Sequence, residues 1–148
     1  MITIQEEGFY DWLPEAREML LQNNADSRNY LAGLPWELDL SFYKTASTNN
    51  SLVIMTARDE HLLAGYHVSY IGTNPHSLGT LFGFDEALYV RPEYRGKGLG
   101  AKLLKSSEKE WVKKGAKVGC LYTTGSGALH RSMGYTGGER LYMKILEA

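Results

Sequence analysis

Three glycines at alternate positions stand between a strand pattern and a helix pattern, and this junction constrains the fold more than any other feature. The segment Leu88–Gly100 reads LYVRPEYRGKGLG. The first turn of a helix has unpaired N–H groups and a partial positive charge, and glycines let a ligand approach the backbone closely. The spacing therefore predicts a strand, a tight turn and a helix N-terminus that can hold phosphate oxygens, with Arg95 and Lys97 beside it.

The same glycines could equally serve a tight turn and nothing more, and their spacing alone does not decide between the two readings. No Gly-Lys-Ser/Thr sequence ends the segment, so it is not a P-loop. Its first glycine does not directly follow the strand, as the dinucleotide-binding fingerprint requires. A protein that binds another nucleotide or phosphate ligand through this turn stays an alternative.

The patterns on either side predict one continuous domain over residues 1–148. Expected strands are Ile2–Glu6, Leu52–Met55, Leu62–Tyr70, Leu81–Val90, Val118–Tyr122 and Tyr142–Leu146, and expected helices run from Pro14 to about Asn24, from Pro35 to about Thr45, from Leu99 to Gly115 and over Ser126–Met133. This order predicts an α/β fold of the α+β type, with a mixed sheet and helices on both faces.

Charge and composition exclude several classes of protein. With 16 Lys and Arg against 17 Asp and Glu, no bulk field attracts nucleic acid or a membrane surface, so neither partner is expected. No apolar run approaches the roughly 20 residues of a membrane span, and the N-terminus lacks a signal-peptide pattern. Cys120 is the single cysteine and the histidines are scattered, so we expect no disulfide and no metal site. A cytoplasmic monomer or homodimer is expected.

Leu88–Gly100 resembles the acetyl-CoA-binding signature of the GNAT superfamily of N-acetyltransferases, and Arg95–Gly100 matches its Arg/Gln-x-x-Gly-x-Gly/Ala core at every fixed position. The resemblance extends from about Leu52 to the end of the chain. It implies a GNAT-like, mostly antiparallel central sheet of six to seven strands flanked by about four helices, with a splay between strands 4 and 5. It also implies an enzyme that transfers the acetyl group of acetyl-CoA to a primary amine of a small molecule, a peptide N-terminus or a protein lysine. The amine would attack directly in a ternary complex.

The resemblance also implies which residues hold the cofactor. Backbone amides of the glycine segment, Arg95–Gly100, would bind the pyrophosphate. Main-chain groups of the preceding strand would pair with the pantetheine arm as an added strand does. Family members often carry an Asn after the fifth strand, where this chain has Thr124. The expected cofactor-binding residues are Leu88, Tyr89, Val90, Arg95, Gly96, Lys97, Gly98, Leu99, Gly100, Thr124, Ser126 and His130.

Amide formation needs a base, because an alkylamine is mostly protonated at neutral pH. Glu86 stands where many family members carry an acidic residue before the Leu-Tyr-Val sequence. Strand alternation places Glu86 on one face with Phe84 and Leu88, and Asp85 on the other. Glu86 is the expected base and Asp85 the alternative. If neither is the base, Glu86 is only a solvated carboxylate at the end of a strand.

The departing thiolate needs a proton, which the family usually takes from a Tyr on the last short helix. Here His130 occupies that position, four residues before Gly134, and an imidazolium can donate a proton. Tyr122, at the end of the fifth predicted strand, is the reserve donor. A His130 that only packs against the cofactor is the other reading.

In this family the N-terminal helices and the central hairpin usually shape the acceptor pocket. Its candidate residues are Trp36, Tyr43, Tyr66, Tyr70 and Glu86. Aromatic rings beside a carboxylate suit an ammonium group, although Trp36 and Tyr43 could instead face the core. A second function hypothesis is a non-catalytic acyl-CoA-binding or partner-binding module on the same fold, because the family's Tyr and Asn are missing.

Overall fold

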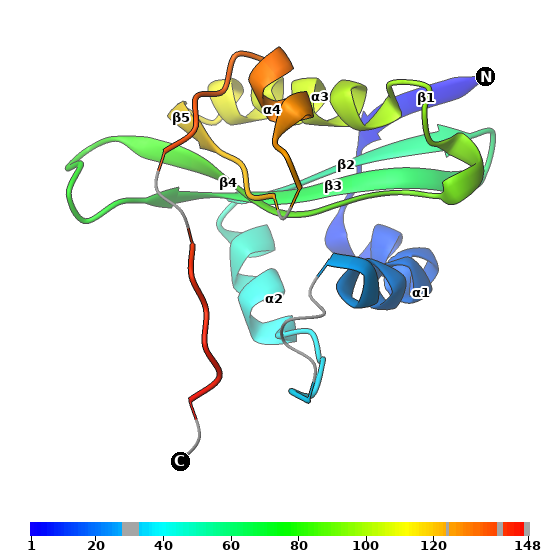
Figure 1. The fold of residues 1–148 in the computed structure, drawn as a ribbon, viewed down its shortest axis with the longest axis horizontal. Coiled ribbons are helices and arrows are strands. Elements are labelled where there is room, and N and C mark those ends of the chain that lie inside the picture. Colours follow the sequence, from blue (N-terminus) through cyan, green and yellow to red (C-terminus); the bar gives the residue numbers. More distant parts are fainter. Residues whose placement is uncertain (28–32, 124, 139–140, 147–148) are drawn as a thin grey trace.

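The computed structural model describes residues 1–27, 33–123, 125–138 and 141–146. A five-stranded sheet in the order β1-β2-β3-β4-β5 forms its middle layer. The strands are β1 (Ile2–Glu6), β2 (Leu52–Asp59), β3 (Leu62–Thr73), β4 (Leu81–Val90) and β5 (Ala116–Cys120). The helices are α1 (Phe9–Ser27), α2 (Leu40–Thr48), α3 (Leu99–Lys113) and α4 (Ala128–Ser132). Helices α1 and α2 cover one face of the sheet, whereas α3 and α4 lie on the other side (Figure 1).

Neighbouring strands run antiparallel except β4 and β5, which are parallel. The predicted α+β class and mixed sheet are confirmed, but the sheet has five strands and not six to seven. The predicted strand over Tyr142–Leu146 is not formed, because the described part of the chain gives that segment no strand to pair with. Its apolar side chains are exposed, and an apolar alternation makes a strand only where a sheet edge receives it.

Two hydrophobic clusters, one on each face, hold the layers together. Trp12 and Leu20 of α1 pack with Tyr66 on one face. Leu103 and Trp111 of α3 pack on the other. Residues of β2 alternate between the two clusters, which explains why its sequence is a continuous apolar run. The strands therefore lie buried between two helical layers.

Helix boundaries differ from the sequence prediction where capping decides them. Helix α2 begins at Leu40 and not at Pro35, because the Asp39 carboxylate accepts a hydrogen bond from the Phe42 amide at 3.0 Å and caps the helix there. Helix α1 begins at Phe9, so Pro14 lies inside it. Within the described ranges, no helix combines the length and hydropathy that a membrane crossing requires.

Candidate active site

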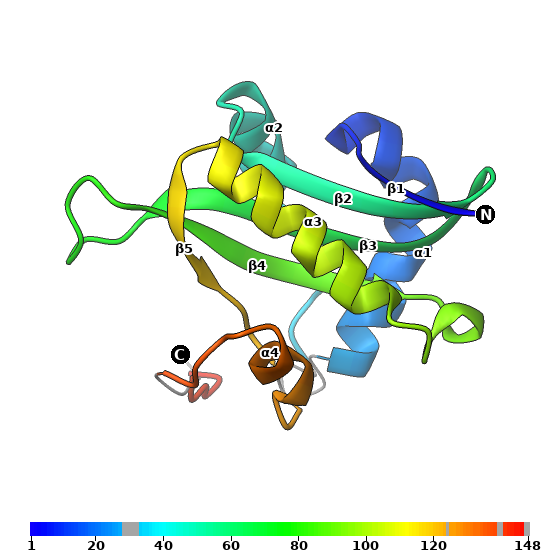
Figure 2. The same ribbon diagram turned by 90° about the horizontal axis from the view of Figure 1, so that it is seen from above.

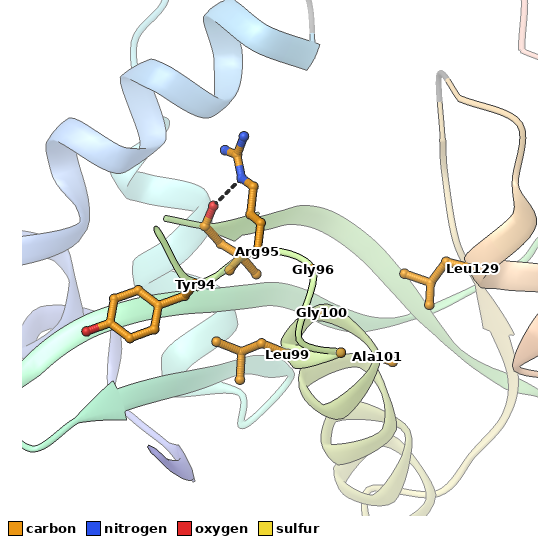
Figure 3. A pocket seen from close by; sticks show the side chains of 9 residues that line it. Tyr94, Arg95, Gly96, Leu99, Gly100, Ala101 and Leu129 are labelled. Atoms are coloured by element: carbon orange, nitrogen blue, oxygen red, sulfur yellow. Dashed lines mark hydrogen bonds between the residues drawn. The ribbon is translucent and has the colours of Figure 1, made fainter. Parts of the chain in front are cut away.

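A cavity of about 230 Å³ lies at the N-terminus of α3, where the glycine segment enters the helix (Figure 3). Strand β4 ends at Val90, a short 3₁₀ turn over Pro92–Tyr94 follows, and the chain then passes through Gly96 and Gly98 into α3. The cavity is lined by Val90, Tyr94, Arg95, Gly96, Gly98, Leu99, Gly100, Ala101 and Leu129. The structure therefore brings the glycines, the end of β4 and one residue of α4 together.

Backbone amides of this segment point to no acceptor in the part of the chain that the structure describes. The first α3 amide with a backbone partner is that of Lys102, which donates to the Gly98 carbonyl at 3.2 Å. For residues 96–101, the described chain offers no hydrogen-bond acceptor to the backbone N–H groups. Gly96 and Gly98 have φ of +74° and +75°, and a Cβ on either would meet nothing within 4 Å. Open, unpaired amides at a helix N-terminus fit the phosphate oxygens of a diphosphate.

The two cations of the segment are already engaged. Arg95 Nε donates a hydrogen bond to the Val90 carbonyl at 2.8 Å, and its guanidinium lies 5.3 Å from the centre of the Tyr89 ring. Figure 3 shows this side chain pointing away from Gly100 and the cavity. Lys97 Nζ lies 3.5 Å from the Glu93 carbonyl. An anion at this place is therefore met by backbone amides first.

Strands β4 and β5 separate before β4 ends. Their last paired residues are Phe84 and Cys120, and β4 continues for six more residues to Val90. Beyond Cys120 the chain turns away from β4 towards α4 (Figure 2). Leu88–Val90 consequently has β3 on one side and no described strand on the other. The fifth strand, predicted over Val118–Tyr122, instead spans Ala116–Cys120 and is paired with β4 up to its end, so the two chains part only beyond Cys120.

A β-bulge places Glu86 at this separation. Val68 pairs with Ala87, and the next residue of β3 pairs with Asp85, so Glu86 is the extra residue on β4. A bulge re-aims the side chains that follow it. Leu88 accordingly packs on the α3 side of the sheet, among the cluster of Leu103 and Trp111.

The bulge overturns one predicted grouping. Phe84 stacks on Tyr70 at 5.3 Å, and Tyr70 contacts Phe42 of α2 at 5.4 Å, so Phe84 faces the α2 side. Leu88 faces α3. The two residues therefore do not share a face, because the extra residue resets the alternation.

Glu86 lies near two phenols. Burial, followed by the charge of Glu86, raises the pKa of Tyr70 above its ordinary value. Burial also raises the pKa of Tyr122, with further contributions from Cys120, Asp85 and Glu86. Tyr122 follows β5 by two residues and is about half exposed. A carboxylate and two neutral phenols thus gather where β4 and β5 separate.

His130 lies on α4, next to Leu129 of the cavity. Its ring Nδ1 is buried, and no hydrogen-bond partner is found for it in the described chain. Ser126 is occupied with the start of α4: its hydroxyl accepts from the Ala128 amide at 3.3 Å, and its carbonyl accepts from Arg131 at 2.7 Å. Thr124 lies outside the described residues.

Some of the candidate acceptor residues lie in the hydrophobic core, and the others lie where β4 and β5 separate. Tyr66 is wholly buried between Trp12 and Tyr89, and Tyr43 stacks on Phe9 at 4.7 Å. Trp36 is partly buried against the same cluster. These three side chains serve the core, whereas Tyr70 and Glu86 lie at the separation.

One polar network escaped the sequence analysis. His67 is fully buried, with Nδ1 2.6 Å from Ser107 Oγ and Nε2 2.9 Å from Asp85 Oδ1. Strand alternation could have indicated this network, since it predicts that the His67 side chain lies on the opposite face from Tyr66 and Val68. In the described ranges, no group of three or more His, Cys, Asp or Glu is arranged to hold a metal ion.

Comparison with known proteins gives a consistent family assignment. The family model described as Acetyltransferase (GNAT) family matches residues 7–135. A search of curated proteins found no matching relative.

Solved structures share the fold at low sequence identity. An aminoglycoside acetyltransferase from an uncultured soil metagenomic sample, in complex with sisomicin, is 16% identical, with a TM-score of 0.72 over 99% of this chain and 96% of that one. Glucosamine-6-phosphate N-acetyltransferase from Arabidopsis thaliana is 16% identical, with a TM-score of 0.73 over 99% of each chain. A predicted acetyltransferase with acetyl-CoA from Clostridium acetobutylicum is 16% identical, with a TM-score of 0.73 over 97% of this chain and 96% of that one.

Proposed function

The chain belongs to the acetyltransferase (GNAT) family, and from this premise we propose that it transfers an acetyl group from acetyl-CoA to a primary amine. One observation carries the proposal: the unpaired amides of residues 96–101 open onto a cavity at Val90, the end of the stretch of β4 that has no β5 partner. The unpaired amides suit a diphosphate. The free edge of β4 suits the pantetheine arm that is attached to this diphosphate in CoA. Related structures that contain acetyl-CoA or CoA support this choice of cofactor.

Backbone groups do most of the binding in this proposal. The amides of residues 96–101 hold the pyrophosphate oxygens. The free edge of Leu88–Val90 offers N–H and C=O groups to the amides of the pantetheine arm, in the manner of an added strand. Bound acetyl-CoA supplies a thioester, whose carbonyl carbon the amine attacks. Because backbone groups carry these contacts, side-chain changes on the outer surface of α3 should alter binding little.

In this proposal, side chains near the place where β4 and β5 separate accept and donate the protons of the reaction. The Glu86 carboxylate takes a proton from the substrate ammonium, directly or through a water. The Tyr122 hydroxyl gives a proton to the leaving sulfur; a tyrosine is protonated at neutral pH at its ordinary pKa, and burial raises the pKa of Tyr122 further. His130 is the alternative donor, since it lies on the short helix beside the cavity.

The acceptor side presents aromatic rings and one carboxylate. Tyr70, Phe42 and Phe84 form a row of ring contacts on the α2 side, and Glu86 lies close enough to influence the pKa of Tyr70. Rings beside a negative charge attract an ammonium group. We therefore place the amine between this row and the separated strands. Relatives that act on aminoglycosides and on glucosamine 6-phosphate support a small-molecule amine.

Two measurements test the proposal. Isothermal titration should show that CoA binds, while ATP and NAD at the same concentrations do not. Release of free thiol from acetyl-CoA should then rise in the presence of a primary amine, tested with sisomicin, glucosamine 6-phosphate and a short peptide with a free N-terminus. Absence of CoA binding at millimolar concentration would contradict the cofactor assignment, and CoA binding without transfer to any of the three probes would contradict the proposed reaction.

A further inference from the structure

A chain of hydrogen bonds runs along the α3 face of the sheet, from α3 to the place where β4 and β5 separate. Ser107 of α3 lies 2.6 Å from His67 Nδ1, and His67 Nε2 lies 2.9 Å from Asp85 Oδ1. The second oxygen of Asp85 accepts a hydrogen bond from the Tyr122 amide at 3.2 Å. With a neutral imidazole, Nε2–H donates to Asp85 and Nδ1 accepts from Ser107. All four members of the chain are then satisfied.

This network does not act as a nucleophilic triad. A serine, a histidine and an aspartate in line resemble the arrangement of a hydrolase. The Ser107 side chain, however, is fully buried under α3, as is the His67 ring. No substrate reaches that hydroxyl, so the network acts through the one group at its open end, which is the Tyr122 amide.

Asp85 continues the contact between β4 and β5 after the backbone ladder has ended. The last ladder pair is Phe84 with Cys120. The next residue of β4 is Asp85, and it holds the chain two residues beyond Cys120 through its side chain. A carboxylate thus takes the place of a backbone acceptor at the point of separation.

The ladder before this point is held in a different way. The Trp111 ring lies against Gly83 of β4 and Gly119 of β5, where an added Cβ would collide with it. Its Nε1 donates to Ser69 Oγ at 2.8 Å. Asp85 takes no part in that contact, so the closed and the open halves of the β4–β5 contact are held by separate groups.

We propose that Asp85 is a positioning residue of the acetyl-transfer site: oriented by His67, its carboxylate fixes the backbone of Tyr122 and thereby places the Tyr122 hydroxyl at the separation of β4 and β5. The inference rests on the proposed function, because the hydroxyl needs a reaction to serve. Asp85 also precedes the bulge residue Glu86, so the same contact fixes the strand on which the proposed base lies.

Three variants separate positioning from general stability. Asp85→Ala removes the contact. Asp85→Asn keeps it, because the amide oxygen still accepts from Tyr122 while the NH₂ group donates to His67, whose ring proton then moves to the Ser107 side. Ser69→Ala is the matched control: Ser69 is the register partner of Asp85, and the change removes two buried hydrogen bonds in the same layer, with Trp111 and with the Val53 carbonyl, but none made by the Asp85 carboxylate.

Expected results differ between the variants. Asp85→Ala should lower kcat by at least about tenfold, with the acetyl-CoA KM within about twofold, since misplacement of a reacting group by one ångström has large effects on rate. Asp85→Asn should recover most of kcat. Ser69→Ala should lower the unfolding temperature without lowering kcat per folded molecule. Amide exchange measured by NMR should speed up at Tyr122 in Asp85→Ala, while the β5 amides stay protected.

Each other outcome overturns the proposal in a recognisable way. Unchanged exchange at Tyr122 in Asp85→Ala means that the contact is wrongly assigned. Faster exchange with unchanged kcat, or an equal loss of kcat in Ser69→Ala, means that Asp85 does not position the reaction. If the unaltered protein transfers no acetyl group to any of the three probes, the proposed function fails and the positioning role fails with it. The exchange result still tells that failure apart from a wrongly assigned contact.

Discussion

At the scale of single residues, Glu86 owes its place to one extra residue in β4. The bulge makes Glu86 the extra residue of β4 opposite β3 and puts it just beyond Phe84, the last β4 residue that pairs with β5. Glu86→Gln keeps the size of the side chain and removes its basicity. We expect kcat to fall by roughly 100-fold, because general base catalysis typically contributes 10²–10⁴-fold. The CoA dissociation constant, measured by titration calorimetry, should stay within about twofold, since backbone amides carry that contact.

Glu110→Gln is the matched control for this change. Glu110 lies near the C-terminal end of α3, where it pairs with Lys113, far along the helix from the glycine segment. Its replacement should leave both kcat and CoA binding unchanged. Full activity of Glu86→Gln across the pH range would show that another group takes the proton.

The identity of the acid can be read from the pH dependence of kcat. Burial, Cys120, Asp85 and Glu86 all raise the pKa of Tyr122, so its hydroxyl loses its proton only above the ordinary tyrosine range. An acid must be protonated to act, so activity that depends on Tyr122 persists as the pH rises to 9.5. If His130 supplies the proton instead, kcat depends on His130 and not on Tyr122.

We expect the first pattern. Tyr122→Phe should lower kcat by roughly 100-fold, as loss of a general acid does, and His130→Gln should lower it by less than about fivefold. Steady-state rates of thiol release between pH 6 and 9.5 measure both. A larger loss of kcat in His130→Gln than in Tyr122→Phe would assign the acid to His130.

At the scale of elements, the turn into α3 depends on left-handed backbone. Gly98 has φ of +75° and open space where a Cβ would lie, so Gly98→Ala strains the backbone by about 1 kcal/mol and projects a methyl group into the cavity. We expect CoA binding to weaken by at least about tenfold, because the methyl group occupies the space through which phosphate oxygens reach the amides. Titration calorimetry measures the affinity, and urea unfolding measures the strain.

Gly79→Ala controls for the strain alone. Gly79 has φ of +77° in the loop between β3 and β4, and a Cβ there would also meet nothing within 4 Å. Both variants should lose similar stability, and only Gly98→Ala should lose affinity for CoA. Equal affinities in the two variants would mean that the glycine segment is merely a turn.

The sequence predicted most elements for simple physical reasons. Strand β4 has the predicted bounds, since its apolar run is closed by Pro92, which has no N–H to continue a ladder. The bulge at Glu86 could not be predicted, because β4 and β3 carry no residue that demands an insertion at that point. Nor could the start of α2, where Asp39 competes with Pro35 as the first-turn signal. In the site, the glycine segment was predictable from spacing, whereas the Asp85–Tyr122 contact depends on where two strands separate.

At the scale of the whole molecule, the two faces of the sheet have different tasks. The α1 and α2 face is a nearly continuous apolar and aromatic core. The α3 face combines an apolar cluster with the polar groups of His67, Ser69 and Ser107. Buried polar groups are costly unless satisfied, and in exchange they fix geometry. On this face the Trp111 ring covers the paired half of β4 and β5, while Ser107 and His67 orient Asp85 at the point where the two strands separate.

Gly83→Ala tests this dependence of the whole molecule on one contact. The Trp111 ring lies where a Cβ on Gly83 would be, and it also lies against Gly119, the register partner of Gly83 on β5. The added methyl group must lift α3 from β4, and overpacking of this kind typically costs about 1–3 kcal/mol. We expect urea unfolding to show a loss of that size.

Gly137→Ala is the control: a Cβ there meets nothing within 4 Å, so stability should not change. Because α3 begins at the cavity, Gly83→Ala should also weaken CoA binding at temperatures where it is fully folded. Full stability of Gly83→Ala would mean that Trp111 does not set the β4–β5 register, and the site would then owe its geometry to Asp85 alone.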